Sequence, residues 1–182
     1  MSKKIVILVG VLLILIVGIG ASWLMIGTPL KEAAAGDVSF KYPKSYLGQA
    51  KRASEGRAEQ LVSLRNDNPL ATIELNKEIA AAKPANILKM NFLDYLDRTA
   101  EQSLRYRYPG YKKLSLERTK ASGRDLTLYK FTYLGQDKQT TLYVSFFIMP
   151  KNNDAYYLFL QAADEKRWQN DTKIIQSSLQ LN

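Results

Sequence analysis

The chain has 182 residues and a formal net charge of +9, and it contains neither histidine nor cysteine. Without these residues it has no Ser–His or Cys–His catalytic pair, no thiolate metal ligand, no disulfide bond and no lipidated N-terminal cysteine. Hydrolysis would have to depend on carboxylates or on a Ser–Lys pair.

The first element is an apolar run, Ile5–Ile26, without a charged side chain. As a helix it would be about 33 Å long, enough to cross a hydrocarbon core of about 30 Å. The α-amino group, Lys3 and Lys4 precede the run, whereas Lys31 and Glu32 beyond it cancel in charge. By the positive-inside rule, the N-terminus should stay in the cytoplasm and the remainder should be extracytoplasmic. We therefore predict a single-pass transmembrane signal anchor in contact with the membrane lipid bilayer.

The alternative is a signal peptide that is cleaved before Ala21 or before Gly36, which would leave a secreted protein. The apolar run continues past the first position, and the second lies well beyond its core, so we favour a retained anchor. The predicted organisation is a cytoplasmic N-terminus at residues 1–4, the anchor, a linker at 27–37 and one extracytoplasmic domain at 38–182.

The first part of the domain predicts short strands. Val38–Pro43 alternates apolar and polar residues and ends in proline, which indicates an edge strand. The linker before it has no hydrophobic period, although its Lys-Glu-Ala-Ala-Ala sequence could form a frayed helical turn. We expect a loop from Lys44 to Gln60. Leu61–Asn66 and Ala71–Ile79 then alternate on either side of the turn sequence Asn66-Asp67-Asn68-Pro69, which predicts a β-hairpin.

The middle of the domain predicts one long helix. Asn91 can cap its start and Pro109-Gly110 ends it. Two acid-first pairs, Asp94 with Arg98 and Glu101 with Arg105, are spaced to meet on its exposed face. The apolar positions recur at helical spacing, at Leu93, Leu96, Ala100 and Leu104.

The last part predicts a β-meander followed by a helix. Turn sequences separate four alternating segments, Lys113–Lys120, Leu126–Leu134, Thr140–Met149 and Ala155–Ala162. Strands joined by tight turns pair antiparallel. The third segment is apolar on both faces, so it should be central and covered on both sides. The final helix begins after Asp164 and carries an apolar stripe made of Trp168, Thr172, Ile175 and Leu179.

This order of elements, with Phe40-Lys41-Tyr42-Pro43 in the early strand and Ile174-Ile175-Gln176-Ser177-Ser178-Leu179 in the last helix, resembles the PsbP/Mog1/DcrB-like group. The resemblance implies an α+β fold of the Mog1/PsbP type, here behind one transmembrane helix. In that fold an antiparallel β-sheet of about six to seven strands has helices packed on its faces, as an α/β/α sandwich. Functions in this group range from photosystem assembly to binding of a nuclear small GTPase and envelope proteins of unclear role, and a shared fold does not transfer function. The absence of histidine argues against any His-dependent metal site of the group.

Carboxylate pairs, which cleave glycosides in other proteins, are the remaining candidate for catalysis. Asp94, Asp97 and Glu101 are expected on the exposed face of the long helix, however, and Asp164-Glu165 suit the positive end of a helix dipole. The sequence has no glycine-rich phosphate loop and no calcium-loop spacing. We therefore predict a protein that is not an enzyme and that has no cofactor and no metal.

One segment combines cations with aromatic rings, namely Arg105, Tyr106, Arg107, Tyr108, Tyr111, Lys112 and Lys113. Its charges could bind an anionic partner while its rings stack on sugars or bases. Alternatively, the arginines complement the helix dipole and the tyrosines fasten the helix to the sheet. Successive side chains of an extended chain point to opposite sides, so we expect one or two rings outside and the others inside. Nucleic acid is disfavoured, because an extracytoplasmic protein rarely meets it.

Three function classes follow from these observations. The leading one is a membrane-anchored extracytoplasmic binding or assembly-support module of the PsbP-related type, non-enzymatic, whose partner is an unknown protein or an anionic envelope polymer. The second is a structural accessory subunit of a membrane protein complex. The third is a carboxylate-based hydrolase.

Overall fold

The structure is a computed structural model that describes residues 29–51, 56–79 and 90–182. In these ranges no helix has both the length and the apolar character needed to cross a bilayer. The predicted anchor Ile5–Ile26 lies outside the described residues, as does the cleavage position at Ala21. Both remain predictions.

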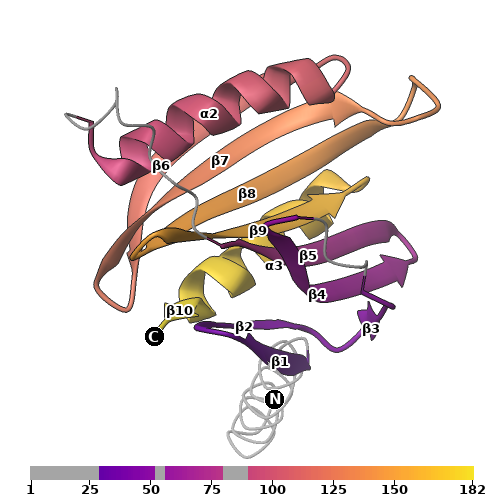
Figure 1. The fold of residues 1–182 in the computed structure, drawn as a ribbon. Helices are drawn as coiled ribbons and strands as arrows, with labels where there is room; N and C mark the ends of the chain where they lie inside the picture. Colours follow the sequence, from indigo (N-terminus) through magenta and orange to yellow (C-terminus); the bar gives the residue numbers. More distant parts are fainter. Residues whose placement is uncertain (1–28, 52–55, 80–89) are drawn as a thin grey trace, which may run out of the picture. The chain divides into compact units, whose positions relative to one another are not determined.

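The centre of the fold is a seven-stranded antiparallel sheet in the order β3-β4-β5-β9-β8-β7-β6 (Figure 1). Its strands are β3 (Leu47–Gly48), β4 (Ala58–Asp67), β5 (Leu70–Glu78), β6 (Lys112–Ala121), β7 (Arg124–Leu134), β8 (Thr141–Lys151) and β9 (Asp154–Ala162). The predicted hairpin is β4–β5, which begins at Ala58 rather than Leu61, and the predicted meander is β6 to β9. The loop expected from Lys44 to Gln60 contains the short strand β3. Both expected groups of strands are confirmed.

Two helices border the meander in sequence, α2 (Phe92–Arg107) and α3 (Glu165–Ser178). The Asn91 side chain accepts a hydrogen bond from the Leu93 backbone N–H at 2.8 Å, and Asp164 does the same for Arg167 at 2.7 Å. Each cap satisfies a backbone donor that has no partner inside its helix. Both helices therefore begin where the sequence predicts.

Pro109-Gly110 follows the end of α2, and glycine is needed in this turn for a steric reason. Gly110 has a φ of +66°, a conformation that side chains disfavour, and a Cβ atom there would lie 2.9 Å from Cγ of Leu134. The chain can therefore turn tightly from the helix into β6.

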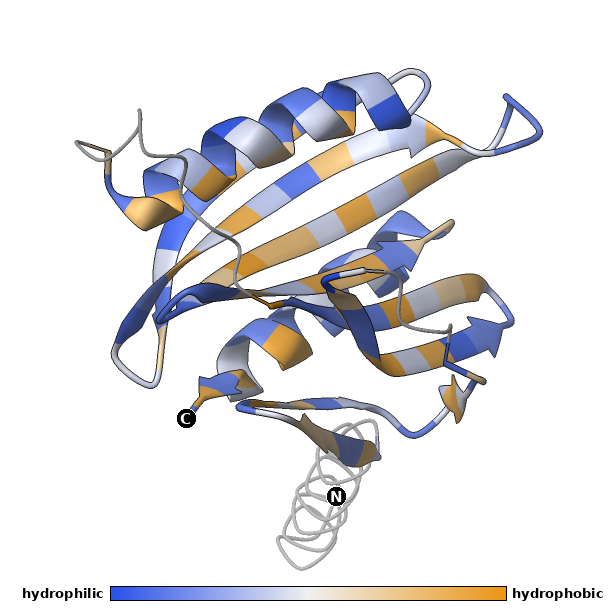
Figure 2. Cartoon of the chain, viewed as in Figure 1, coloured by the Kyte–Doolittle hydropathy of each residue, from blue (hydrophilic) through white to orange (hydrophobic). Residues whose placement is uncertain are grey.

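The helices pack on opposite faces of the sheet. Leu93, Leu96 and Leu104 of α2 join a core cluster that contains Phe146 of β8, whereas the neighbouring Phe147 belongs to the cluster under α3. The cluster under α3 also includes Trp168, Ile175 and Leu179. Figure 2 shows hydrophobic residues along β8, in keeping with a strand that is covered on both sides. The predicted α/β/α arrangement and the central place of this strand are confirmed.

Buried polar groups under α3 find partners within the fold. Trp168 donates its indole N–H to Ser145 Oγ at 2.8 Å, and the Tyr46 hydroxyl donates to Asp171 at 2.7 Å. Arg167 also contacts Asp171 at 3.3 Å and lies over the ring of Tyr46. Because unpaired buried polar groups are costly, these contacts fix how α3 sits on the sheet.

A second, three-stranded sheet corrects two expectations. It has the order β1-β2-β10, with β1 (Leu30–Ala35), β2 (Val38–Pro43) and β10 (Gln180–Leu181). The alanine-rich stretch inside the predicted linker is thus a strand and not a helical turn. Gly36, at a φ of +60°, turns it back onto β2, and cross-strand pairing overrides helix propensity. β2 is the middle strand of this sheet and not an edge strand.

Phe146→Ala and Trp168→Ala should each lower the free energy of unfolding by about 3 to 5 kcal/mol, because each removes a large buried ring from one of the two cores. Tyr106→Ala is the control, since Tyr106 is 96% exposed. We would measure chemical unfolding of the full chain in mild detergent by circular dichroism. If both core variants unfold like the parent, the assignment of the two cores is wrong.

Candidate functional site

The basic and aromatic segment lies where α2 ends and β6 begins. The Tyr108 N–H donates to the Leu104 carbonyl oxygen at 3.1 Å and closes the helix, and the Tyr111 N–H donates to the Tyr108 carbonyl oxygen across the turn. The Leu134 N–H donates to the Pro109 carbonyl oxygen at 2.9 Å and holds this turn against the end of β7. We call this region the α2–β6 corner.

Of the three tyrosines of the corner, two pack inward and one points outward, but strand alternation is not the reason, because Tyr106 lies in the last turn of α2. Tyr108 packs with its ring centroid 4.6 Å from that of Tyr133, and Tyr111 lies 5.2 Å from Phe131. Burial raises the pKa of both hydroxyls. Tyr106, in contrast, is almost fully exposed. Two rings therefore fasten the helix to the sheet, and one is available to a partner.

Two of the four cations of the corner are paired with an acid, and the other two form no ion pair with a described residue. Glu101 accepts from Arg105 at 2.9 Å and from Lys113 at 3.3 Å, and hydrogen bonding from Arg105 lowers the pKa of this carboxyl. Arg107 and Lys112 are exposed and make no ion pair with any residue that the structure describes. The part of the corner free to bind is thus Tyr106, Arg107 and Lys112, while Arg105, Lys113, Tyr108 and Tyr111 are engaged within the fold.

Two acids of α2 share one arginine of β6. Arg118 contacts Asp94 at 2.6 Å and Asp97 at 2.5 Å, so Asp94 is paired across to the sheet and not with Arg98 as predicted. Asp97 is 7% exposed, which corrects its predicted place on the exposed face of the helix. The burial of Asp97 could have been predicted from the spacing, because Asp97 lies one helical turn after the buried Leu93 and therefore on the same face of α2.

Asp97 is held in an apolar setting by few partners. Thr127 donates its hydroxyl to Asp97 Oδ2 at 3.2 Å, whereas Asp97 Oδ1 has no hydrogen-bond partner among the described residues. Burial raises the pKa of this carboxyl, against the opposing effects of Thr127 and Arg118. The pair Asp94 and Asp97 is therefore engaged in holding α2 on β6, which gives no support to a hydrolytic role.

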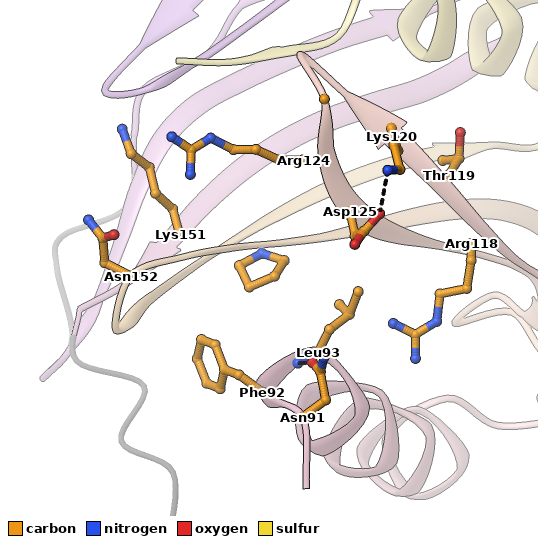
Figure 3. A pocket seen from close by; sticks show the side chains of 12 residues that line it. Asn91, Phe92, Leu93, Arg118, Thr119, Lys120, Arg124, Asp125, Lys151 and Asn152 are labelled. Carbon is orange, nitrogen blue, oxygen red and sulfur yellow. Dashed lines mark hydrogen bonds and ion pairs between the residues drawn. The ribbon is translucent and has the colours of Figure 1, made fainter.

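A cavity of about 700 Å³ opens at the other end of α2 (Figure 3). It lies between the first turn of α2, the β6–β7 turn and the β8–β9 turn. Its lining consists of Asn91, Phe92, Leu93, Arg118, Thr119, Lys120, Gly123, Arg124, Asp125, Pro150, Lys151 and Asn152. We call it the α2 N-terminal pocket. Sequence reasoning missed it, because its residues come from three segments that only the folded sheet brings together.

Metal binding finds no support in the described ranges, where no three Asp or Glu side chains converge as a ligand set. The acids near α2 are separated by the arginine and lysine side chains that pair with them. The described carboxylates of this flank therefore act as partners of cations.

Comparison with known proteins identifies a fold and no family. No family model matches the sequence, and no curated protein is significantly similar to it. The solution structure of cyanobacterial PsbP (CyanoP) from Synechocystis matches with a TM-score of 0.56 and 11% identity, covering 87% of this chain and 96% of that one. A crystal structure from Bacteroides thetaiotaomicron has a TM-score of 0.50 and 11% identity, covering 84% of this chain and 48% of that one.

The crystal structure of LpqN, a protein involved in cell envelope biogenesis of Mycobacterium tuberculosis, matches with 14% identity, covering 86% of this chain and 87% of that one. Its TM-score is 0.48. The match to CyanoP shows that the described part of this chain has a PsbP-like α+β fold, as the sequence resemblance implied. At 11% identity the likeness concerns the fold alone.

Asp97→Asn should change how stability depends on pH. The folded state raises the pKa of the Asp97 carboxyl above its ordinary value of 3.8. As the pH falls toward 4, the folded protein therefore binds a proton at Asp97 before the unfolded chain does. The parent should therefore gain stability relative to Asp97→Asn between pH 7 and about pH 4. We would measure urea unfolding across this range, with the exposed Asp125→Asn as a control. Parallel pH profiles for the parent and Asp97→Asn would contradict the assignment.

Proposed function

We propose that this protein is a non-enzymatic binding or assembly-support module, held at the outer face of a membrane by Ile5–Ile26. The proposal is supported by the order of segments in the chain, in which an anchor-like apolar run is followed by a PsbP-like domain. The first strand of this domain begins at Leu30, four residues after the apolar run ends at Ile26. The acids of α2 that could have served catalysis are paired with Arg118 and Lys113. Because these acids are paired with cations, the surface of the domain favours a binding role over a hydrolytic role.

The binding face that we propose is the α2–β6 corner, and its partner is an anionic envelope polymer. Arg107 and Lys112 form no ion pairs with described residues, so their charges are available to a partner. The outward ring of Tyr106 offers a flat apolar surface for a sugar. The binding is largely electrostatic, so it should weaken with salt at a Debye length of about 8 Å.

A structural accessory subunit of a membrane complex is the second candidate. It is favoured by Leu114 and Leu116, which are exposed on the edge strand β6 and would suit a protein surface. Purification in mild detergent separates the two candidates. A stoichiometric membrane protein that copurifies with the full chain would support the accessory role, whereas retention on anionic polymer without such a subunit would support the binding module.

The anchor can be tested in cell fractions. The full chain should stay with membranes after alkaline carbonate washing, because a helix of about 33 Å spans the bilayer. Protease added from outside should digest the domain. A soluble protein that begins at Ala21 or Gly36 would contradict the anchor, and cleavage before Gly36 would also remove β1 from its sheet.

The corner can be tested by charge removal. The double variant Arg107→Gln/Lys112→Gln should lose most retention on anionic wall polymer at low salt, because it removes the corner cations that form no ion pair with described residues. Its melting temperature should stay within about 2 °C of the parent, since exposed substitutions change stability little.

Lys166→Gln/Lys173→Gln on the exposed side of α3 is the matched control, with the same change in net charge. It should bind the polymer like the parent. If both double variants bind as the parent does, the corner is not the binding face, whereas equal losses from both would mean that net charge alone governs retention.

A further inference from the structure

The α2 N-terminal pocket draws cationic side chains from three strands. Arg118 and Lys120 come from β6, Arg124 from the start of β7 and Lys151 from the end of β8. Gly123 has a φ of +78° in the turn between β6 and β7, and this tight turn places Arg124 next to β6. In Figure 3, Arg124 and Lys151 lie on one side of the pocket and Arg118 on the other, with Phe92 and Leu93 of α2 below.

Two of these four cations are already engaged. Arg118 is held by Asp94 and Asp97. Lys151 contacts Asp37 at 2.7 Å and donates to the backbone carbonyl oxygen of Asn182. Their charges are matched, so they shape the wall of the pocket and add little attraction for a ligand.

The other two cations are available to a ligand. Arg124 is exposed and makes no ion pair with any residue in the described ranges, so its planar fork of N–H donors is free. Lys120 is 3.6 Å from Asp125, and their side chains are 67% and 72% exposed. A surface pair of this kind contributes little to stability, so Lys120 can leave Asp125 when a stronger anion arrives.

The remaining lining combines the polar residues Asn91, Thr119, Asp125 and Asn152 with a small apolar part. The apolar part is formed by Phe92 and Leu93, which begin α2, and by the partly buried Pro150, which follows the buried stretch of β8. The Leu93 N–H is already taken by the Asn91 side chain, and Asp94 stands in the first turn, so the helix terminus is not the source of attraction. The pocket thus offers an apolar floor beside two available cations and one carboxylate.

We propose that the α2 N-terminal pocket binds a phosphate group that is joined to an apolar body. A phosphate monoester carries about −1.5 to −2 charges at pH 7 and can bind both Arg124 and Lys120. A ligand with a single carboxylate would only replace Asp125 as the partner of Lys120. Arg124 binds two phosphate oxygens with its fork, Lys120 turns from Asp125 to a third, and the apolar body rests on Phe92 and Pro150. The same chemistry occurs in lipid head groups and in soluble organic phosphates.

Phenyl phosphate is a probe with this chemistry. Full-length protein in phosphatidylcholine nanodiscs should bind it with a dissociation constant on the order of 1 mM by calorimetry. Arg124→Gln should weaken binding at least about tenfold, and Arg124→Lys should be intermediate because lysine lacks the planar fork. Lys173→Gln on α3 and the corner variant Arg107→Gln/Lys112→Gln should both bind like the parent, so this test is independent of the α2–β6 corner.

Three results would overturn the proposal. They are undetectable binding of phenyl phosphate by the parent, equal binding by the parent and Arg124→Gln, and inorganic phosphate that binds as tightly as phenyl phosphate. Because Arg124 is exposed at the start of β7, its variants should keep the circular dichroism spectrum and melting temperature of the parent.

The source of the phosphate is decided by a second arm of the experiment. Nanodiscs that contain phosphatidic acid, whose head group is a phosphate monoester, should displace phenyl phosphate from the parent if lipid head groups reach the pocket. Unchanged phenyl phosphate binding in these nanodiscs would assign the site to soluble organic phosphates. Either result is consistent with a phosphate site in the pocket, provided that Arg124→Gln weakens the binding of phenyl phosphate.

Discussion

The pairing of β5 with β9 holds the whole sandwich together. It runs from Ala71 opposite Ala162 to Glu78 opposite Ala155 and joins the β4–β5 hairpin to the meander. The core under α3 needs this joined sheet, because it includes Leu64 of β4 and Ile73 of β5 together with residues of β8 and β9, whereas the core under α2 is built on the meander. The ladder brings together residues far apart in the sequence, so its closure is costly and its loss would separate the fold into two small parts.

Local signals explain what could be predicted from the sequence. The caps Asn91 and Asp164 placed the starts of both helices, and turn residues between alternating segments placed the meander. Each of these rules acts over a few residues. The faces of β8 could be assigned for the same reason, since Phe146 and Phe147 must point to opposite sides of any strand.

Features that depend on distant partners were not predictable in this way. β1 is alanine-rich and would favour a helix alone, yet pairing with β2 makes it a strand. The β2 strand has its middle place in the three-stranded sheet because β10, at the far end of the sequence, pairs with Val38 and Ser39. The α2 N-terminal pocket likewise exists only once three separate segments meet. The α2–β6 corner could be located because its residues are contiguous, but which of its cations are free depended on Glu101.

The positions of free positive charge follow from the way α2 lies beside β6. Along this flank the acids of α2 face the cations of β6, with Glu101 on Lys113 and both Asp94 and Asp97 on Arg118. These pairs neutralise the middle of the flank. Cations that form no ion pair with a described residue lie toward its two ends, Arg107 and Lys112 in the α2–β6 corner and Arg124 in the α2 N-terminal pocket. A net charge of +9 gives no information about this distribution. The two ends differ in kind, because the corner offers charges around an outward ring, whereas the pocket sets exposed cations beside the apolar side chains of Phe92 and Pro150. An extended anionic polymer suits the corner, and a single phosphate on an apolar body suits the pocket.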